Sequence, residues 1–308
     1  MRHRVYGSLR AQKIAGFCTT LPSPPRQLRR GYALLCYYPA VRDAAPQCGY
    51  GKLRSVSTRG VFRYAGAAPV LLSLSALAAT LDGPNAWAAN VAGMAIFLDP
   101  GHNGVKDPSI AREVPNGRGG TKDCNTMGTA TTNGYPEHAF NWDVVTRIRD
   151  SLNQMGVRTA LSRDNDNSVG PCVDQRAAMA NAMHPDAIIS IHADGGPPSG
   201  RGFHVNCSSP PLNDAQAGPA VQLATTMRDS LGASGMQPST YIGANGLFDR
   251  ADLACLNLAQ YPAILVELGN MKNSDEAAQM ESSDGRAKYA TAVTQGIVAY
   301  LSAKTAAG

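Results

Sequence analysis

The sequence predicts an α/β fold: a single globular domain in which helices flank both faces of a mixed, mostly parallel sheet, with a metal site at the strand ends. The first observation is an alternation along the chain. Short apolar runs rich in β-branched residues are followed by longer segments whose apolar residues recur every three or four positions, as in a sheet covered by helices. The second is that two apolar runs end in histidine and a third ends in glutamate. The third is that the sequence contains no internal repeat, which favours one domain.

The predicted strands are short, and the three strongest are almost wholly apolar, as expected for strands that are buried on both faces of a sheet. The predicted strand at residues 202–205 ends before Pro210 and Pro211, because proline cannot donate a hydrogen bond to a central ladder. In chain order the strands are expected at residues 95–98, 157–162, 187–191, 202–205 and 263–266.

The predicted helices follow the 3.6-residue period. The clearest spans residues 137–155, where five apolar side chains recur at helical spacing, with Pro136 suited to its entry and Gly156 to its end. Further helices are expected at residues 174–183 and 217–231, as a short turn at 253–258, and as one or two helices within 275–301.

The first 88 residues differ in composition from the rest. Residues 1–60 are rich in arginine and proline without periodicity, so we expect a disordered leader or an over-extended gene start. Residues 61–88 combine Arg63, an apolar run and a small-x-small triplet, the pattern of a secretory signal peptide; the alternative is a buried helix of the domain. The run is too short for a confident membrane span, so we expect an exported domain over residues 89–308.

The charge balance divides at the same place. The whole chain has a net charge of +5, but 12 of its 28 Lys and Arg residues and only 2 of its 23 Asp and Glu residues precede residue 89. The remaining domain therefore has 16 basic and 21 acidic residues, a net charge of −5. This acidic balance gives no support to a nucleic-acid partner.

Cysteine usage in the expected domain suggests a disulfide. Residues 110–134 are rich in glycine, threonine and asparagine and predict a long loop or hairpin that burial alone cannot hold. Four cysteines follow residue 89, an even number that is typical of disulfides in an exported protein. We expect Cys124 to pair with Cys172, because each lies in a polar loop after a regular element, while Cys207 and Cys255 either pair or remain free.

Four residues in separate blocks carry the candidate chemistry. His102 and His192 end two of the apolar runs, Glu267 ends a third, and Glu137 opens a predicted helix, where His138 is its local competitor. Two imidazoles and one carboxylate make a three-ligand site that leaves zinc a fourth, open position. Mg²⁺ and Ca²⁺ fit less well because they prefer oxygen ligands. A second carboxylate beside the metal is what metal-assisted hydrolysis needs as a general base.

The same blocks carry a family resemblance. They are Asp-Pro-Gly-His-Asn-Gly at residues 99–104, a glutamate opening a helix, Ser-Ile-His-Ala-Asp at 190–194 and Val-Glu-Leu-Gly-Asn at 266–270. Together they resemble the signature blocks of zinc-dependent N-acetylmuramoyl-L-alanine amidases, which act on peptidoglycan, and the resemblance covers residues 95 to 301. Two departures are Asp194, where the family usually has asparagine, and the long interval between His102 and Glu137.

The resemblance implies a zinc site of His102, Glu137 and His192, with Glu267 as the catalytic acid/base. It also implies a substrate, the amide between N-acetylmuramic acid and L-alanine of the stem peptide. Helical geometry then turns His138 about 100° away from the metal.

Each of these residues has a simpler structural interpretation. Glu267 could be a buried structural carboxylate paired with Arg163 or Arg176. His184 and His204 lack a comparable context, and we expect them on the surface or in loops.

Two aspartates near the histidines have open roles. Asp99 and Asp194 could orient the imidazoles from behind, or could serve only the neighbouring turns. Some relatives carry an inserted helix that plugs the site, but the only helix predicted between His192 and Glu267 is one that the fold needs. We therefore expect an open groove, with the loop around Cys124 as the best candidate for controlling access.

The sequence thus predicts an exported zinc hydrolase of peptidoglycan or muropeptides, in the periplasm, the cell wall or outside the cell, and acting as a monomer. One alternative is a zinc peptidase that cuts within the stem peptide. Another is a non-catalytic wall-binding protein that has kept the fold.

Overall fold

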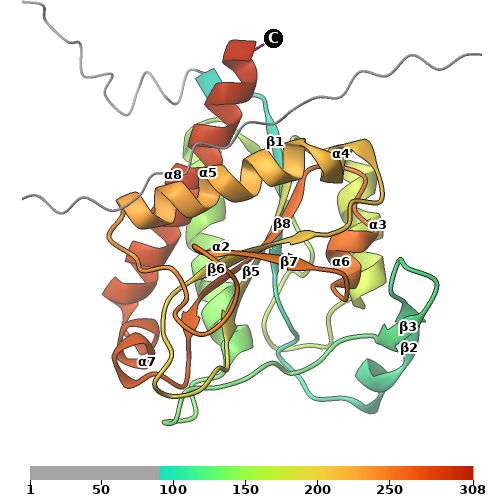
Figure 1. Cartoon of the computed structure of the whole chain (residues 1–308). Helices are drawn as coiled ribbons and strands as arrows, with labels where there is room; N and C mark the ends of the chain where they lie inside the picture. The colour runs from blue at the N-terminus through green and yellow to red at the C-terminus, as the bar shows by residue number, and fades with distance from the viewer. Residues whose placement is uncertain (1–89, 308) are drawn as a thin grey trace, which may run out of the picture. The chain divides into compact units, whose positions relative to one another are not determined.

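The computed structural model describes residues 90–307 as an α/β domain. Its centre is a six-stranded sheet in the order β4-β1-β5-β8-β6-β7 (Figure 1). The predicted leader at residues 1–60 and the predicted signal peptide at 61–88 lie outside the described residues. Within residues 90–307, no helix combines the length and the apolar character needed to cross a membrane.

The sheet is mixed and mostly parallel, as predicted. Of its neighbouring strand pairs, β6 with β8 is antiparallel and the others are parallel. The strands are β1 Ala95–Pro100, β4 Arg158–Leu161, β5 Ala187–Asp194, β6 His204–Ser208, β7 Leu247–Arg250 and β8 Ala263–Asn270.

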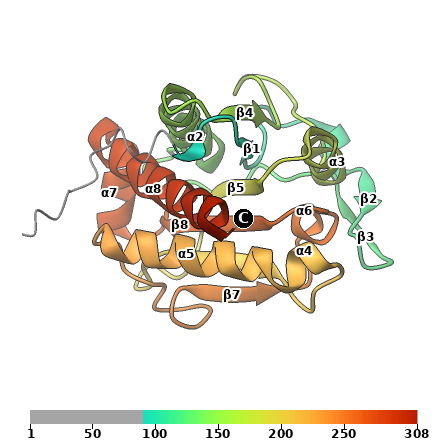
Figure 2. The same ribbon diagram turned by 90° about the horizontal axis from the view of Figure 1, so that it is seen from above.

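Helices cover both faces of the sheet. One face packs against α2 Glu137–Gln154, α5 Pro219–Ala233 and α8 Ser283–Ala307, and the other against α3 Val173–Met183 and α6 Ala254–Asn257 (Figures 1 and 2).

Alternation along the central strand β8 explains where the site can form. Ile264 and Val266 point into the larger core, whereas Leu265 belongs to the smaller cluster with α3 and α6. Successive side chains of a strand point to opposite faces, so Glu267 lies on the face of Leu265. His192 is level with Glu267 in the neighbouring strand and shares this thinly covered face.

The remaining elements are short. They are the 3₁₀ helix η1 Pro108–Ala111, the hairpin strands β2 Glu113–Pro115 and β3 Thr121–Asp123, α4 Asp214–Ala217 and α7 Ser274–Glu281. The predicted loop or hairpin therefore contains a hairpin, and the C-terminal segment forms two helices. The predicted strand at 202–205 begins two residues later, and β7 was not predicted because half of its four residues are charged.

The predicted disulfide is present. Cys124 and Cys172 are bonded across a sequence separation of 48, and both are buried beside Val114 of the hairpin. The bond ties the segment after β3 to the start of α3. Cys207 and Cys255 are free.

Reducing the Cys124–Cys172 bond should lower the melting temperature. A loop of this length corresponds to about 4 kcal/mol in the chain-entropy model, or about 10 °C for a domain of this size. Calorimetry of a Cys124→Ser, Cys172→Ser double variant measures the effect, with Cys255→Ala as the control that removes only a free thiol. An unchanged melting temperature, or a non-reducing peptide map in which Cys124 is unpaired, would contradict the tether.

Candidate metal centre

Three side chains from distant segments converge with their donor atoms facing one another. Glu137 Oε1 lies 3.0 Å from His102 Nε2 and 2.9 Å from His192 Nδ1. The two imidazole nitrogens are 3.2 Å apart. Two ligands bound about 2.1 Å from one ion at the tetrahedral angle lie about 3.4 Å apart. The donor spacing therefore fits a small tetrahedral ion, and among the described residues these three form a possible metal cluster.

Each donor is delivered by the end of an element. His192 lies in β5 and Glu137 is the first residue of α2. His102 follows β1 by two residues and has a φ of 65°, a left-handed conformation that is uncommon for residues other than glycine. A strained backbone of this kind persists where its surroundings fix it, and Arg176 Nη2 donates to the carbonyl of His102 at 2.6 Å.

The glycine-rich loop before α2 supports the donors from behind. The carbonyl of Thr126 lies 3.0 Å from His102 Nδ1. An N–H on Nδ1 can donate to it, which leaves the Nε2 lone pair directed at the centre. The amide of Thr129 donates to Glu137 Oε2 at 2.9 Å, and the amide of Ala193 donates to Oε1 at 3.2 Å.

Glu137 is held ionised by its neighbours. Burial alone would raise its pKa, but His102 and His192 outweigh burial and hold the pKa below its ordinary value. An ionised carboxylate is the form that binds a metal.

The turn after β1 is fixed by two buried arginines. Arg176 pairs with Asp99 at 2.8 Å and also donates to the carbonyl of Pro100. Arg163 donates to the same carbonyl and, through Nη2, to that of Gly101. Neither arginine pairs with Glu267, so the structural interpretation of Glu267 as their partner is wrong.

The two aspartates do not orient the imidazoles. Asp99 accepts from Ser162 and Ser190 as well as from Arg176, and so joins β1 to its two neighbouring strands. Asp194 accepts from Tyr241 at 2.9 Å. The imidazole of His102 is held instead by a backbone carbonyl, which has no signature in the sequence.

Glu267 faces the same centre without a partner of its own. Its strand β8 pairs with β5, where it is level with His192, and its Oε2 is buried without a hydrogen-bond partner among the described residues. Burial raises the pKa of Glu267 well above its ordinary value. Repulsion from Glu137 and Asp194 raises the pKa further, and Arg250 offsets part of the shift.

The other histidines lie outside the donor set. His138 turns away, as predicted, and binds Asp166 at 2.9 Å. His184 ends α3 and is exposed. The expectation for His204 is wrong: it is 1% exposed in β6, opposite Glu267, and burial lowers its pKa to about 4. His204 lay inside the predicted strand at 202–205, but the sequence did not show that this strand is buried on both faces.

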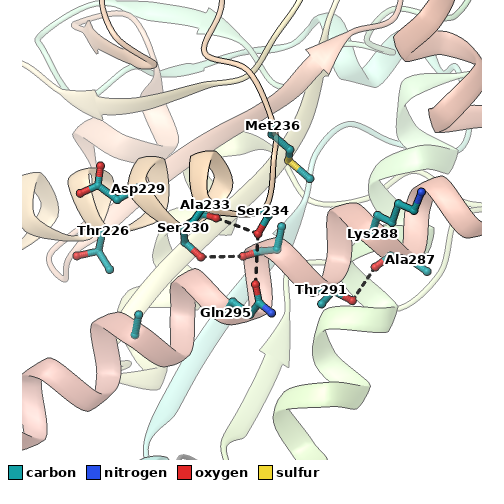
Figure 3. A pocket seen from close by; sticks show the side chains of 12 residues that line it. Thr226, Asp229, Ser230, Ala233, Ser234, Met236, Ala287, Lys288, Thr291 and Gln295 are labelled. Atoms are coloured by element: carbon teal, nitrogen blue, oxygen red, sulfur yellow. Dashed lines mark hydrogen bonds between the residues drawn. The ribbon is translucent and has the colours of Figure 1, made fainter. Parts of the chain in front are cut away.

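The donors and Glu267 line a cavity of about 460 Å³ that is also bordered by the hairpin and α6. A larger hollow of about 980 Å³ lies between α5 and α8 (Figure 3). Its lining combines alanines and Met236 with short polar side chains, and Ser234 and Gln295 are hydrogen-bonded to each other. It contains no cluster of metal-binding side chains, so the smaller cavity is the candidate site.

Comparison with known proteins agrees with this geometry. A family model described as N-acetylmuramoyl-L-alanine amidase matches residues 96–299. The chain belongs to this family. An N-acetylmuramoyl-L-alanine amidase of Mycobacterium tuberculosis is 62% identical over 221 residues, which cover 72% of this chain and 92% of that relative.

Solved structures of family members have the same fold. The crystal structure of the amidase Ami1 from Mycobacterium smegmatis matches with 63% identity and a TM-score of 0.69, covering 70% of this chain and 99% of Ami1. The amidase AmiC2 of Nostoc punctiforme, at 23% identity and a TM-score of 0.52, covers 68% of this chain and 97% of its own, and shares the fold.

The loop glycine Gly128 generates a prediction about the donors. A Cβ at Gly128 would lie 2.4 Å from Glu137 Oε2 and 2.6 Å from His102 Cδ2. Gly128→Ala should therefore weaken metal binding at these donors by about tenfold or more, the scale of a disturbed outer contact. Titration against a chromophoric chelator measures the affinity.

Gly134→Ala is the matched control. Gly134 lies in the same loop and also has a positive φ, but a Cβ there meets nothing within 4 Å. Both variants carry the conformational cost of about 1–2 kcal/mol, and only Gly128→Ala crowds the donors. Equal metal affinities in the two variants would show that the close approach of Gly128 to the donors does not matter.

Proposed function

We propose that this chain is a zinc-dependent N-acetylmuramoyl-L-alanine amidase that hydrolyses the amide between N-acetylmuramic acid and L-alanine of the peptidoglycan stem peptide. The observation that carries the proposal is the convergence of three zinc-type donors and an unpartnered carboxylate, Glu267, in one cavity. Family membership and the 62% identity to a mycobacterial amidase support the choice of bond.

The donor set fits zinc. Two imidazoles and one carboxylate suit this borderline-soft ion, and the open side of the cluster leaves a fourth position for substrate or water. When bound, zinc supplies Lewis acidity, which acidifies the attacking water and polarises the amide carbonyl.

Glu267 is the proposed acid/base. Its free Oε2 accepts a proton from the attacking water as the new carbon–oxygen bond forms. It then gives the proton to the alanine nitrogen as the carbon–nitrogen bond breaks. The muramoyl product keeps a carboxylate, and the stem peptide leaves with a free amine.

The metal assignment can be tested by substitution. The purified protein should hold about one zinc per chain, and His102→Ala, Glu137→Ala and His192→Ala should each lose it. His138→Ala is the control, because this neighbouring histidine binds Asp166 instead. Elemental analysis gives the metal content, and zinc retained by all three ligand variants would remove the assignment.

Glu267→Gln separates catalysis from metal binding. The amide keeps the shape of the side chain but is a poor proton acceptor, so zinc should remain while turnover falls by roughly two to four orders of magnitude. Steady-state rates with a soluble muropeptide provide the measurement. Near-normal turnover in this variant would assign the base to another group.

The bond that is cut can be identified by mass spectrometry of digested muropeptides. An amidase releases intact stem peptides that begin with alanine, together with glycan free of peptide. A zinc peptidase acting within the stem would leave alanine on the sugar, and a non-catalytic wall-binding protein would release nothing. Either result would replace the proposed function.

We also propose that the protein is exported as a monomer to the periplasm, the cell wall or the exterior. The disulfide and the signal-like segment at residues 61–88 support export. N-terminal sequencing of the exported protein should find a start close to Ala89, after the small-x-small triplet. A start within residues 1–60 would overturn both the signal peptide and the over-extended gene start.

A further inference from the structure

Two cations from distant segments meet in the wall of the candidate cavity. Lys122 of the hairpin strand β3 and Arg250, the last residue of β7, both line it. Both bind Asp252. Lys122 Nζ donates to its carbonyl at 3.1 Å, and Arg250 donates to both of its carboxylate oxygens at 2.7 Å.

Lys122 and Arg250 both have N–H groups that form no hydrogen bond among the described residues. Asp252 occupies Arg250 Nε and Nη2, so Nη1 has no partner among the described residues. Lys122 makes a single hydrogen bond, and its ammonium has three N–H donors. The Arg250 side chain is 25% exposed and its guanidinium carbon lies 5.1 Å from the centre of the Phe248 ring, which limits its freedom.

The strand register sets the distance from the proposed reaction. His204 of β6 is level with Glu267 of β8, and Arg250 is level with Ser208, four residues further along β6. Four residues of strand span about 13 Å. The backbone of Arg250 therefore lies toward the other ends of the strands from the metal donors. The cavity extends between the two positions on one face of the sheet.

The charges along the cavity divide accordingly. Arg176 is paired with Asp99, while Glu137, Glu267 and Asp194 lie around the candidate metal centre. Lys122, Arg250 and the exposed Asp123 also line the cavity, and Arg250 is near enough to Glu267 to act on it electrostatically. Asp252, which is bound to Arg250, balances the charge of this group, so what it offers an anion is the unused donors of Lys122 and Arg250.

We propose that Lys122 and Arg250 form a subsite for a free carboxylate of the stem peptide, one residue beyond the alanine whose amide is cut. This inference rests on the proposed function. The second residue begins about 3.5 Å from the scissile nitrogen, and its backbone, its carboxylate and the arginine side chain cover the remaining distance. Charge-assisted hydrogen bonds to a carboxylate are among the stronger contacts that such donors can make. The sugar side of the bond offers no comparable anion.

Binding of two dipeptides tests the subsite without turnover. L-alanyl-D-glutamine has a free α-carboxylate, and its side-chain amide stands for the continuing peptide. L-alanyl-D-glutaminamide differs only in that this carboxylate is an amide. Calorimetry on the purified zinc-loaded chain should give about tenfold tighter binding of the carboxylate form.

Four variants assign the preference to the cations. Lys122→Met and Arg250→Gln should each bring the ratio of the two dissociation constants close to one. Arg149→Gln, which removes an arginine paired with Asp150 on the surface of α2, should leave the ratio unchanged, as should Lys288→Met on exposed α8.

A ratio near one in the wild-type chain, or a tenfold ratio retained by both Lys122→Met and Arg250→Gln, would overturn the subsite. Muropeptide cleavage by the same preparation keeps this failure apart from that of the proposed function. Cleavage without a carboxylate preference rejects the subsite alone. A carboxylate preference without cleavage supports the anion site and rejects the proposed reaction.

Discussion

The candidate centre depends on the buried ion pair between Asp99 at the end of β1 and Arg176 in α3, whose charged atoms are 2.8 Å apart. Asp99 also accepts hydrogen bonds from Ser162 and Ser190, and therefore links the ends of three neighbouring strands. Arg176 continues the network to the carbonyl of His102. Removing one partner of a buried pair leaves an uncompensated charge, at a cost of about 3–5 kcal/mol. Exposed pairs contribute about 0–1 kcal/mol.

The support of the donors is mostly backbone. Glu137 receives amide hydrogens from Thr129 and Ala193, and His102 faces the carbonyl of Thr126. Thr126 and Thr129 lie in the loop before α2, which the Cys124–Cys172 bond fixes to the start of α3, and Ala193 lies in β5. The geometry of the donors is thus coupled to covalent and packing constraints outside the cavity.

An element could be predicted from the sequence when its own residues favour it, and not when it forms only through contact with a neighbouring element. The strands of β1, β5 and β8 are buried on both sides, so their apolar runs identify them without tertiary information. The edge strand β7 has an exposed aspartate and a half-buried arginine, and it forms only because β6 provides a partner. This pairing depends on the tertiary fold, and the sequence of β7 shows no alternation of apolar and polar residues that would predict it.

The same distinction holds for the centre. His102, His192 and Glu267 were candidates because they end apolar runs, the family resemblance selected Glu137 over His138, and the structure brings all four together. The backbone contacts could not be predicted, since an amide or a carbonyl is common to every residue. His204 was misplaced because β6 is buried on both of its faces, a tertiary property that its short polar sequence does not show.

The order of the strands has a consequence for how the molecule matures. β8 lies in the middle of the sheet, paired with both β5 and β6, yet it is the last strand in the chain. A polypeptide that ends before residue 263 already contains His102, Glu137 and His192, but it lacks the strand that joins the two halves of the sheet and carries Glu267. A chain that ends there therefore lacks both the central strand of the sheet and one carboxylate of the candidate centre.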